Sequence, residues 1–163
     1  MGLNARLRPV PVLVVVLVLG FVGASSEAQQ TSSGKNTAAM TGEVDPPPGC
    51  LQDVPIGTIE KGKKGHLLIV EMTASSTPEG FPGARIFKPQ VDGIGLEGAN
   101  SVDSPDSSQF DNAAVSAVWW LDLDAAESNN PGELVGQPLE LTFGQLCGGD
   151  PYRVTAVARM LKK

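Results

Sequence analysis

Apolar and polar residues alternate with a period of two near the C-terminus of this 163-residue chain, and this pattern constrains the fold more than any other feature. Successive side chains of a β-strand point to opposite faces, so the alternation predicts a strand with one buried face. A helix would require apolar residues three or four positions apart instead. The apolar positions of this segment are Val154, Ala156, Ala158 and Met160.

Further segments repeat the pattern and are separated by turn-forming residues. The longer predicted strands are 66–74, 113–124 and 139–143, and the shorter ones are 54–60, 84–88 and 91–96. Gly, Pro and Asn are concentrated in the breaks, whereas apolar residues with helical spacing are almost absent. Six to eight strands at this spacing predict an all-β fold, namely a single antiparallel β-sandwich with a Greek-key or jelly-roll-like strand order.

The N-terminus resembles a secretory signal peptide over residues 1–28. Arg6 and Arg8 precede an apolar run that extends from Val10 to Val22. Small residues then offer a cleavage site before Gln29, with a rival site after Ser26. The apolar run is shorter than the roughly 20 residues that a spanning helix requires. We therefore expect a secreted or periplasmic protein with no transmembrane segment after processing.

Residues 29–49 are mainly small and polar, and they end in three consecutive prolines. Such a composition offers little apolar surface to bury, so it predicts a disordered Pro/Ser/Thr-rich tether. The predicted organisation is a signal peptide over 1–28, a tether over 29–49 and one β-sandwich domain over 50–163.

Cys50 and Cys147 are the two cysteines of the chain. In an exported protein, a pair of cysteines that lacks CxxC spacing is expected to form a disulfide. We therefore predict one disulfide between Cys50 and Cys147.

The chain is acidic, with a net charge of −6, and its acidic residues are unevenly distributed. No Lys or Arg occurs between Lys88 and Arg153, although eleven Asp and Glu residues do. Nucleic acids require a basic surface, so this chain is predicted not to bind them. The acidic stretch is either a solvated surface or a surface for a cation or a basic protein partner.

Several of these acids are candidate calcium ligands. Asp122 and Asp124 are two residues apart near the end of a predicted strand, so both carboxylates would project from one face. Glu127 follows closely, and Asp103 and Asp106 lie in the long segment 98–112. Calcium prefers oxygen ligands of this kind. Because the register of a defined calcium loop is absent, the alternative is ordinary solvated charge at the end of a strand.

Trp119 and Trp120 are adjacent, so on a strand they would face opposite sides. Trp119 shares its face with Val115 and Leu121 and is expected in the core. Trp120 shares its face with Asp122, and an exposed indole beside carboxylates could bind a glycan. The alternative is that Trp120 packs beneath a loop.

No catalytic, nucleotide or cofactor motif stands out. His66 is the single histidine, so a zinc or copper site of the usual kind would lack ligands. We therefore predict a secreted non-catalytic module with a binding or structural role outside the cytoplasm and no cofactor other than calcium. Two alternatives remain open, which are a calcium-stabilised lectin-like carbohydrate-binding module and a small secreted carboxylate-dependent hydrolase.

Overall fold

The computed structural model describes residues 29–44, 49–51, 54–76, 85–103, 114–143, 146–148 and 152–163. The predicted signal peptide over 1–28 and Asp106 lie outside these residues. Strands dominate the described part of the chain, and their pairing within the sheets is antiparallel. The all-β prediction is therefore confirmed.

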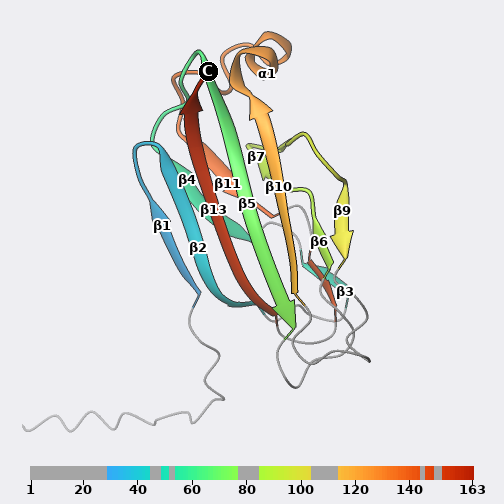
Figure 1. Cartoon of the computed structure of the whole chain (residues 1–163). Helices are drawn as coiled ribbons and strands as arrows, with labels where there is room; N and C mark the ends of the chain where they lie inside the picture. The colour runs from blue at the N-terminus through green and yellow to red at the C-terminus, as the bar shows by residue number, and fades with distance from the viewer. Residues whose placement is uncertain are drawn as a thin grey trace, which may run out of the picture.

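A five-stranded sheet forms the largest layer (Figure 1). Its strands, in spatial order, are β1 (Gln30–Ser33), β2 (Thr37–Val44), β13 (Tyr152–Lys162), β5 (His66–Ser76) and β10 (Ala114–Asp122). β13 and β5 pair along their whole length, from Tyr152 opposite Ser76 to Lys162 opposite His66. The period-two segments predicted at 66–74 and near the C-terminus therefore lie side by side at the centre of this sheet.

The remaining strands form two four-stranded sheets. One has the order β4 (Pro55–Ile59), β11 (Leu139–Thr142), β7 (Gln90–Val91) and β8 (Ile94–Gly95). The other has the order β3 (Gly49–Leu51), β12 (Leu146–Gly148), β6 (Arg85–Phe87) and β9 (Ser101–Asp103). In Figure 1, β4, β7 and β11 lie behind the five-stranded sheet.

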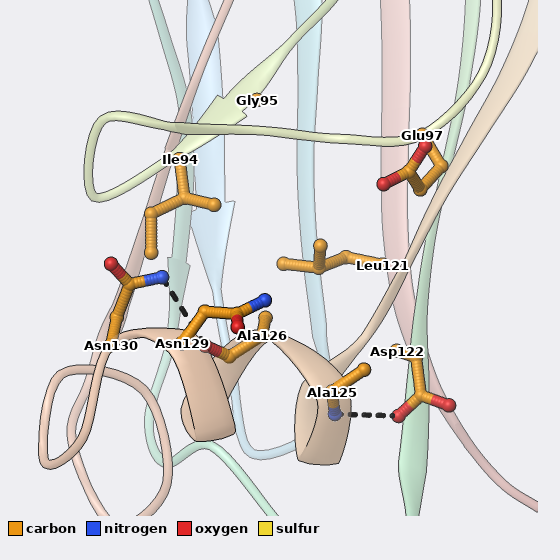
Figure 2. A pocket seen from close by; sticks show the side chains of 9 residues that line it. All are labelled: Ile94, Gly95, Glu97, Leu121, Asp122, Ala125, Ala126, Asn129 and Asn130. Carbon is orange, nitrogen blue, oxygen red and sulfur yellow. Dashed lines mark hydrogen bonds between the residues drawn. The ribbon is translucent and has the colours of Figure 1, made fainter.

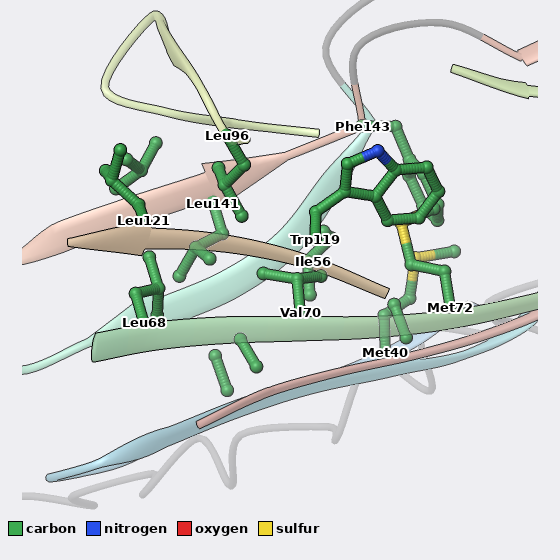
Figure 3. Packing of buried hydrophobic residues seen from close by; sticks show 14 of the residues in the cluster. Met40, Ile56, Leu68, Val70, Met72, Leu96, Trp119, Leu121, Leu141 and Phe143 are labelled. Atoms are coloured by element: carbon green, nitrogen blue, oxygen red, sulfur yellow. The ribbon is translucent and has the colours of Figure 1, made fainter. Parts of the chain in front are cut away.

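The hydrophobic core forms one cluster of buried side chains (Figure 3). β2, β13, β5 and β10 of the five-stranded sheet contribute alternate residues, including Val70, Met72 and Trp119, whereas β1 is exposed along its length. Ile56 and Leu141 enter the same cluster from β4 and β11. The residues of β13 that its alternation predicted to be buried, namely Val154, Ala156, Ala158 and Met160, are buried, and so is Tyr152 at the start of the strand.

The prediction of a disordered tether over 29–49 is wrong. Residues 30–44 form β1 and β2, and β2 pairs with β13 along its length. Ala38 and Met40 are buried on the inner face, with exposed fractions of 1% each. The strand is hard to recognise because alanine contributes little to a hydrophobic pattern. In the sheet, Ala38 lies opposite Ala158, so two small side chains face each other on the inner face. The folded domain thus begins near residue 30.

Backbone hydrogen bonds connect both long edges of the five-stranded sheet to the other strands. Beyond β1, the Gly34 carbonyl accepts from the Glu60 N–H at 2.9 Å. Beyond β10, Trp120 and Glu97 exchange two backbone hydrogen bonds of 2.7 and 3.2 Å. An unpaired sheet edge favours pairing with other chains, so these contacts protect the parts of the edges that they cover.

Candidate functional site

Trp120 lies on the outer face of the five-stranded sheet, opposite the buried cluster. Its side chain is 46% exposed, whereas the neighbouring Trp119 is fully buried. Among the described residues, the large apolar side chains that remain exposed are Trp120, Val118 at 52% and Leu161 at 49%. All three lie on this one face, because they alternate with the buried residues of β10 and β13. Trp119 lies in the core as expected, and of the two alternatives left open for Trp120 the structure shows the exposed one.

Half-buried apolar residues connect these exposed side chains. Ile69 lies directly opposite Trp120 in the register of the sheet, and Leu67 lies opposite Leu161. Val157 and Val118 lie on either side of Glu71. The outer face therefore carries apolar side chains on all three of the strands β10, β5 and β13.

Paired polar side chains interrupt and border this area. Arg159 on β13 forms an ion pair with Glu71 on β5, and each side chain is about half exposed. In the next row of the sheet, the hydroxyls of Thr73 and Ser116 lie 2.8 Å apart. An apolar surface that also presents fixed donors and acceptors is suited to a ligand with both kinds of group.

The segment around Gly98 holds both tryptophans in place. Glu97 fixes the backbone of Trp120 from the side opposite β5, and the Trp119 indole N–H donates to the Ala99 carbonyl at 2.7 Å. Gly98 has a φ of +129°, and a Cβ there would lie 2.8 Å from the Trp119 ring. Because Gly98 lacks a side chain, residues 97–99 can approach the Trp119 indole closely. The strand that carries Trp120 therefore has β5 on one side and Glu97 on the other.

The sequence placed Asp122 and Asp124 together on a strand, and the structure corrects this placement. Asp122 ends β10 and is the N-cap of helix α1 (Leu123–Asn129), where its Oδ1 accepts from the Asp124 N–H at 3.0 Å. Asp124 lies in the first helical turn. An N-cap carboxylate satisfies helix N–H groups that would otherwise lack a partner, which explains why the strand ends here.

Both carboxylates nevertheless converge on one cation, the ammonium group of Lys163. Its Nζ lies 2.6 Å from Asp122 Oδ1 and 3.0 Å from Asp124 Oδ2. The hydrogen bond from Lys163 and the Ala125 N–H lower the pKa of Asp122. The N–H of Gly65, followed by Lys163, lowers the pKa of Asp124.

Glu127 points instead into the loop that follows α1. Its carboxylate accepts from the N–H groups of Gly132, Leu134 and Val135 at 2.6, 2.8 and 2.9 Å. The hydrogen bond from Val135, followed by those from Leu134 and Gly132, lowers the pKa of Glu127. A carboxylate with three backbone donors organises its loop, because it satisfies three N–H groups at once.

Asp103 lies on β9 and pairs with Arg85 on β6, and the hydrogen bond from Arg85 lowers its pKa. The structure thus unites Asp122 with Asp124 but gives Glu127 and Asp103 separate partners. Within the described ranges, no three His, Cys, Asp or Glu side chains are grouped so that they could hold a metal ion.

A small pocket of about 180 Å³ lies between α1 and the segment that leaves β8 (Figure 2). Asn129 and Asn130 line it from the helix, and Ile94 and Glu97 line it from the other side. The Asn130 side chain donates to the Ala126 carbonyl at 3.2 Å. Pockets that enclose drug-sized ligands usually exceed about 300 Å³, so this one accommodates a small group at most.

The structure also groups carboxylates that the sequence analysis did not single out. Asp92, Glu133 and Glu140 line an open hollow of about 400 Å³. Asp92 has a φ of +48°, and burial raises its pKa, as do the charges of Glu140 and Glu133. Its neighbour Gly93 marks a turn between β7 and β8 that the apolar pattern of 91–96 concealed. A carboxyl group with a raised pKa beside other carboxylates is a candidate proton donor.

Comparison of the chain with family models, with curated proteins and with solved structures gives no match. In the part of the chain that the structure describes, no helix has the length and apolar character needed to cross a membrane. Function must therefore be inferred from the side chains themselves.

Proposed function

We propose that this chain is an exported, non-catalytic binding module that contacts its partner through the outer face of the five-stranded sheet. One observation carries the proposal: the large apolar side chains that remain exposed among the described residues all gather on that face. Exposed apolar clusters on soluble proteins are frequently interaction sites. A purely structural role would not require an indole on the surface.

We further propose that the two small sheets together form the second layer of a β-sandwich. Strands of the two sheets are close neighbours in the sequence: only three residues separate β3 from β4, and three separate β11 from β12. The single core cluster between the layers supports this interpretation, because packed sheets share one layer of buried side chains.

The proposed module is closed by a disulfide between Cys50 and Cys147. The register of β3 and β12 supports it, because Cys147 is the Cα partner of Cys50. Opposed residues of antiparallel strands have Cα atoms roughly 4.5–5.5 Å apart, which falls in the range of disulfides. Intact mass measured with and without alkylation is expected to show no free thiol. Two alkylated cysteines in the unreduced protein would contradict the disulfide.

The signal peptide over 1–28 gives this module its proposed location, secreted or periplasmic. The proposal predicts that the mature protein begins at or just before Gln29, which N-terminal sequencing of the exported fraction would reveal. Because β1 begins at Gln30, cleavage there would leave the described fold complete. A mature N-terminus at Met1 would contradict export.

Hydroxyl-radical footprinting tests whether the outer face is occupied in the producing cells. Trp120 is expected to be oxidised readily in the isolated protein and several-fold less in the intact extracytoplasmic fraction. The Arg85–Asp103 region supplies an internal reference, because its oxidation is expected to be equal in both samples. Equal oxidation of Trp120 in the two samples would refute the proposed binding role.

A carboxylate-dependent hydrolase is a second candidate function, favoured by the raised pKa of Asp92 beside Glu140. The candidate predicts turnover of a glycoside or ester panel that is lost in Asp92→Asn. Asparagine tolerates a positive φ, so this variant is expected to fold. A panel without turnover would remove the hydrolase and leave the binding module.

A further inference from the structure

The chemistry of the outer face also indicates what kind of ligand it would bind. We define the Trp120 platform as Val118, Trp120, Ile69, Glu71, Val157 and Arg159. These residues occupy two adjacent rows on the three neighbouring strands β10, β5 and β13. Leu67 and Leu161 form the row that follows. The indole is therefore flanked by aliphatic side chains on one sheet.

The platform is rigid where the indole is attached. The Trp120 N–H and carbonyl both bond Glu97, at 3.2 and 2.7 Å, and the strand that carries Trp120 pairs with β5 on its other side. Beneath it, Trp119 is fully buried and anchored to Ala99. A binding group that is already fixed loses little conformational entropy when its ligand arrives.

The size of the platform argues against a second copy of the chain as the occupant. With strands about 4.8 Å apart and same-face residues about 6.8 Å apart, the two rows of the platform and the following row of Leu67 and Leu161 cover roughly 14 by 20 Å on three strands. This area of about 280 Å² is well below the roughly 800 Å² that each partner buries in a stable protein interface.

The ion pair at the centre of the platform argues in the same direction. Glu71 lies between Val118 and Val157, and its partner Arg159 lies beside Ile69. A dry protein interface would have to strip water from both charges, which is costly. Hydroxyl groups can donate to Glu71 and accept from Arg159, so a hydroxylated ligand would replace that water.

We infer that the Trp120 platform binds an uncharged saccharide chain, an inference that rests on the proposed binding function. A pyranose ring has an apolar C–H face that can stack on the indole, and its hydroxyls can bond Glu71 and Arg159. Thr73 and Ser116 place further hydroxyls at the next row. The platform contains one acid and one base, and the whole chain carries −6, which disfavours polyanionic saccharides.

The inference is tested by titrating the exported full-length protein with cellohexaose, chitohexaose and mannohexaose by isothermal calorimetry and tryptophan fluorescence. At least one hexasaccharide is expected to bind with a Kd below about 1 mM, a free energy of about −4 kcal/mol. Trp120→Ala should weaken that binding at least about fivefold, since stacking on an aromatic ring contributes about 1–3 kcal/mol and about 1.4 kcal/mol corresponds to tenfold in Kd. Trp120→Phe should keep part of the affinity.

Thr31→Ala is the control, because Thr31 is exposed on β1, at the opposite edge of the five-stranded sheet from β10, and lies outside the Trp120 platform. Its effect on the Kd is expected to stay below twofold. The emission of buried Trp119 reports whether each variant is folded.

Three outcomes would overturn the inference. They are no binding of any of the three hexasaccharides, equal binding by Trp120→Ala, or a stable dimer that Trp120→Ala converts to monomer. The last outcome would assign the face to a second copy. Protection of Trp120 in the footprinting experiment would still support a binding role in each case, so failure of the saccharide inference and failure of the proposed function remain distinguishable.

Discussion

Replacing Met40 by alanine tests whether the N-terminal hairpin belongs to the core. Met40 is 1% exposed on β2, and its side chain packs near Met72 in the buried cluster (Figure 3). The substitution removes three heavy-atom groups, which corresponds to about 2.4 kcal/mol of lost burial at about 0.8 kcal/mol each. The cavity left behind adds to this loss, and buried Met→Ala changes cost about 2–5 kcal/mol in total. We expect the free energy of unfolding to fall by about 3 kcal/mol.

Thermal unfolding followed by circular dichroism measures this effect. For a domain of this size, about 3 kcal/mol corresponds to a decrease in Tm of roughly 10 °C. Thr41→Val is the matched control, because Thr41 is the next residue of β2 but faces outward, and such surface changes usually stay within about 0.5 kcal/mol. A Met40→Ala protein as stable as the control would refute the assignment of residues 37–44 to the sheet.

Three further predictions concern close packing, pH and metal ions. In a denaturant titration, Gly57→Ala should lower the free energy of unfolding by about 2–4 kcal/mol. The reason is that the new Cβ would lie 2.6 Å from the Ser32 carbonyl oxygen, at a residue whose φ is +144°. Gly95→Ala is the control and should have little effect, because a Cβ at Gly95 would meet only the flexible side chain of Lys88. Glu127→Gln should lower the Tm at pH 7. The lowered pKa of Glu127 means that its stabilisation is present above its unfolded value of about 4.3 and is lost as pH falls through the lower pKa of the folded state, so the Tm values of the two proteins should converge in acid. A constant difference in Tm across pH would contradict a role for the charge. The Tm should be the same within about 1 °C in EDTA and in millimolar calcium, because a ligand that binds only the folded state would raise it; an increase of several degrees would instead support the predicted calcium site.

The sequence identified strands best where large apolar residues alternate. Val154 to Met160 could be assigned to a face because each inner position carries a clearly apolar or small residue in an unbroken period of two. β2 was missed because its inner positions begin with Ala38, and because Thr and Gly dilute the pattern. β2 is a strand because it pairs with β13, where Ala38 lies opposite Ala158. Gly57 of β4 also lets β4 approach Ala38 closely. Neither contact can be recognised from the local sequence of β2.

The candidate site divides in a similar way. The outward orientation of Trp120 follows from the period of two alone and was predicted. The partners of the acidic residues were not, because Lys163 is 39 residues from Asp124 and Arg85 is 18 residues from Asp103. The helix that begins after Asp122 is equally hard to recognise, since in the sequence an N-cap carboxylate resembles any other acid at the end of a strand.

The two adjacent tryptophans connect the stability of the fold to its proposed function. Trp119 points inward and Trp120 outward, so one short segment of β10 contributes both a core anchor and a surface group. The segment Glu97–Ala99 contacts both of them, through the backbone of Trp120 and through the indole of Trp119. Any change that displaces Trp119 from the core must therefore also disturb the backbone that carries Trp120. For this reason the exposed indole is positioned by a strand segment whose inner face is anchored in the core, as a preformed binding group requires.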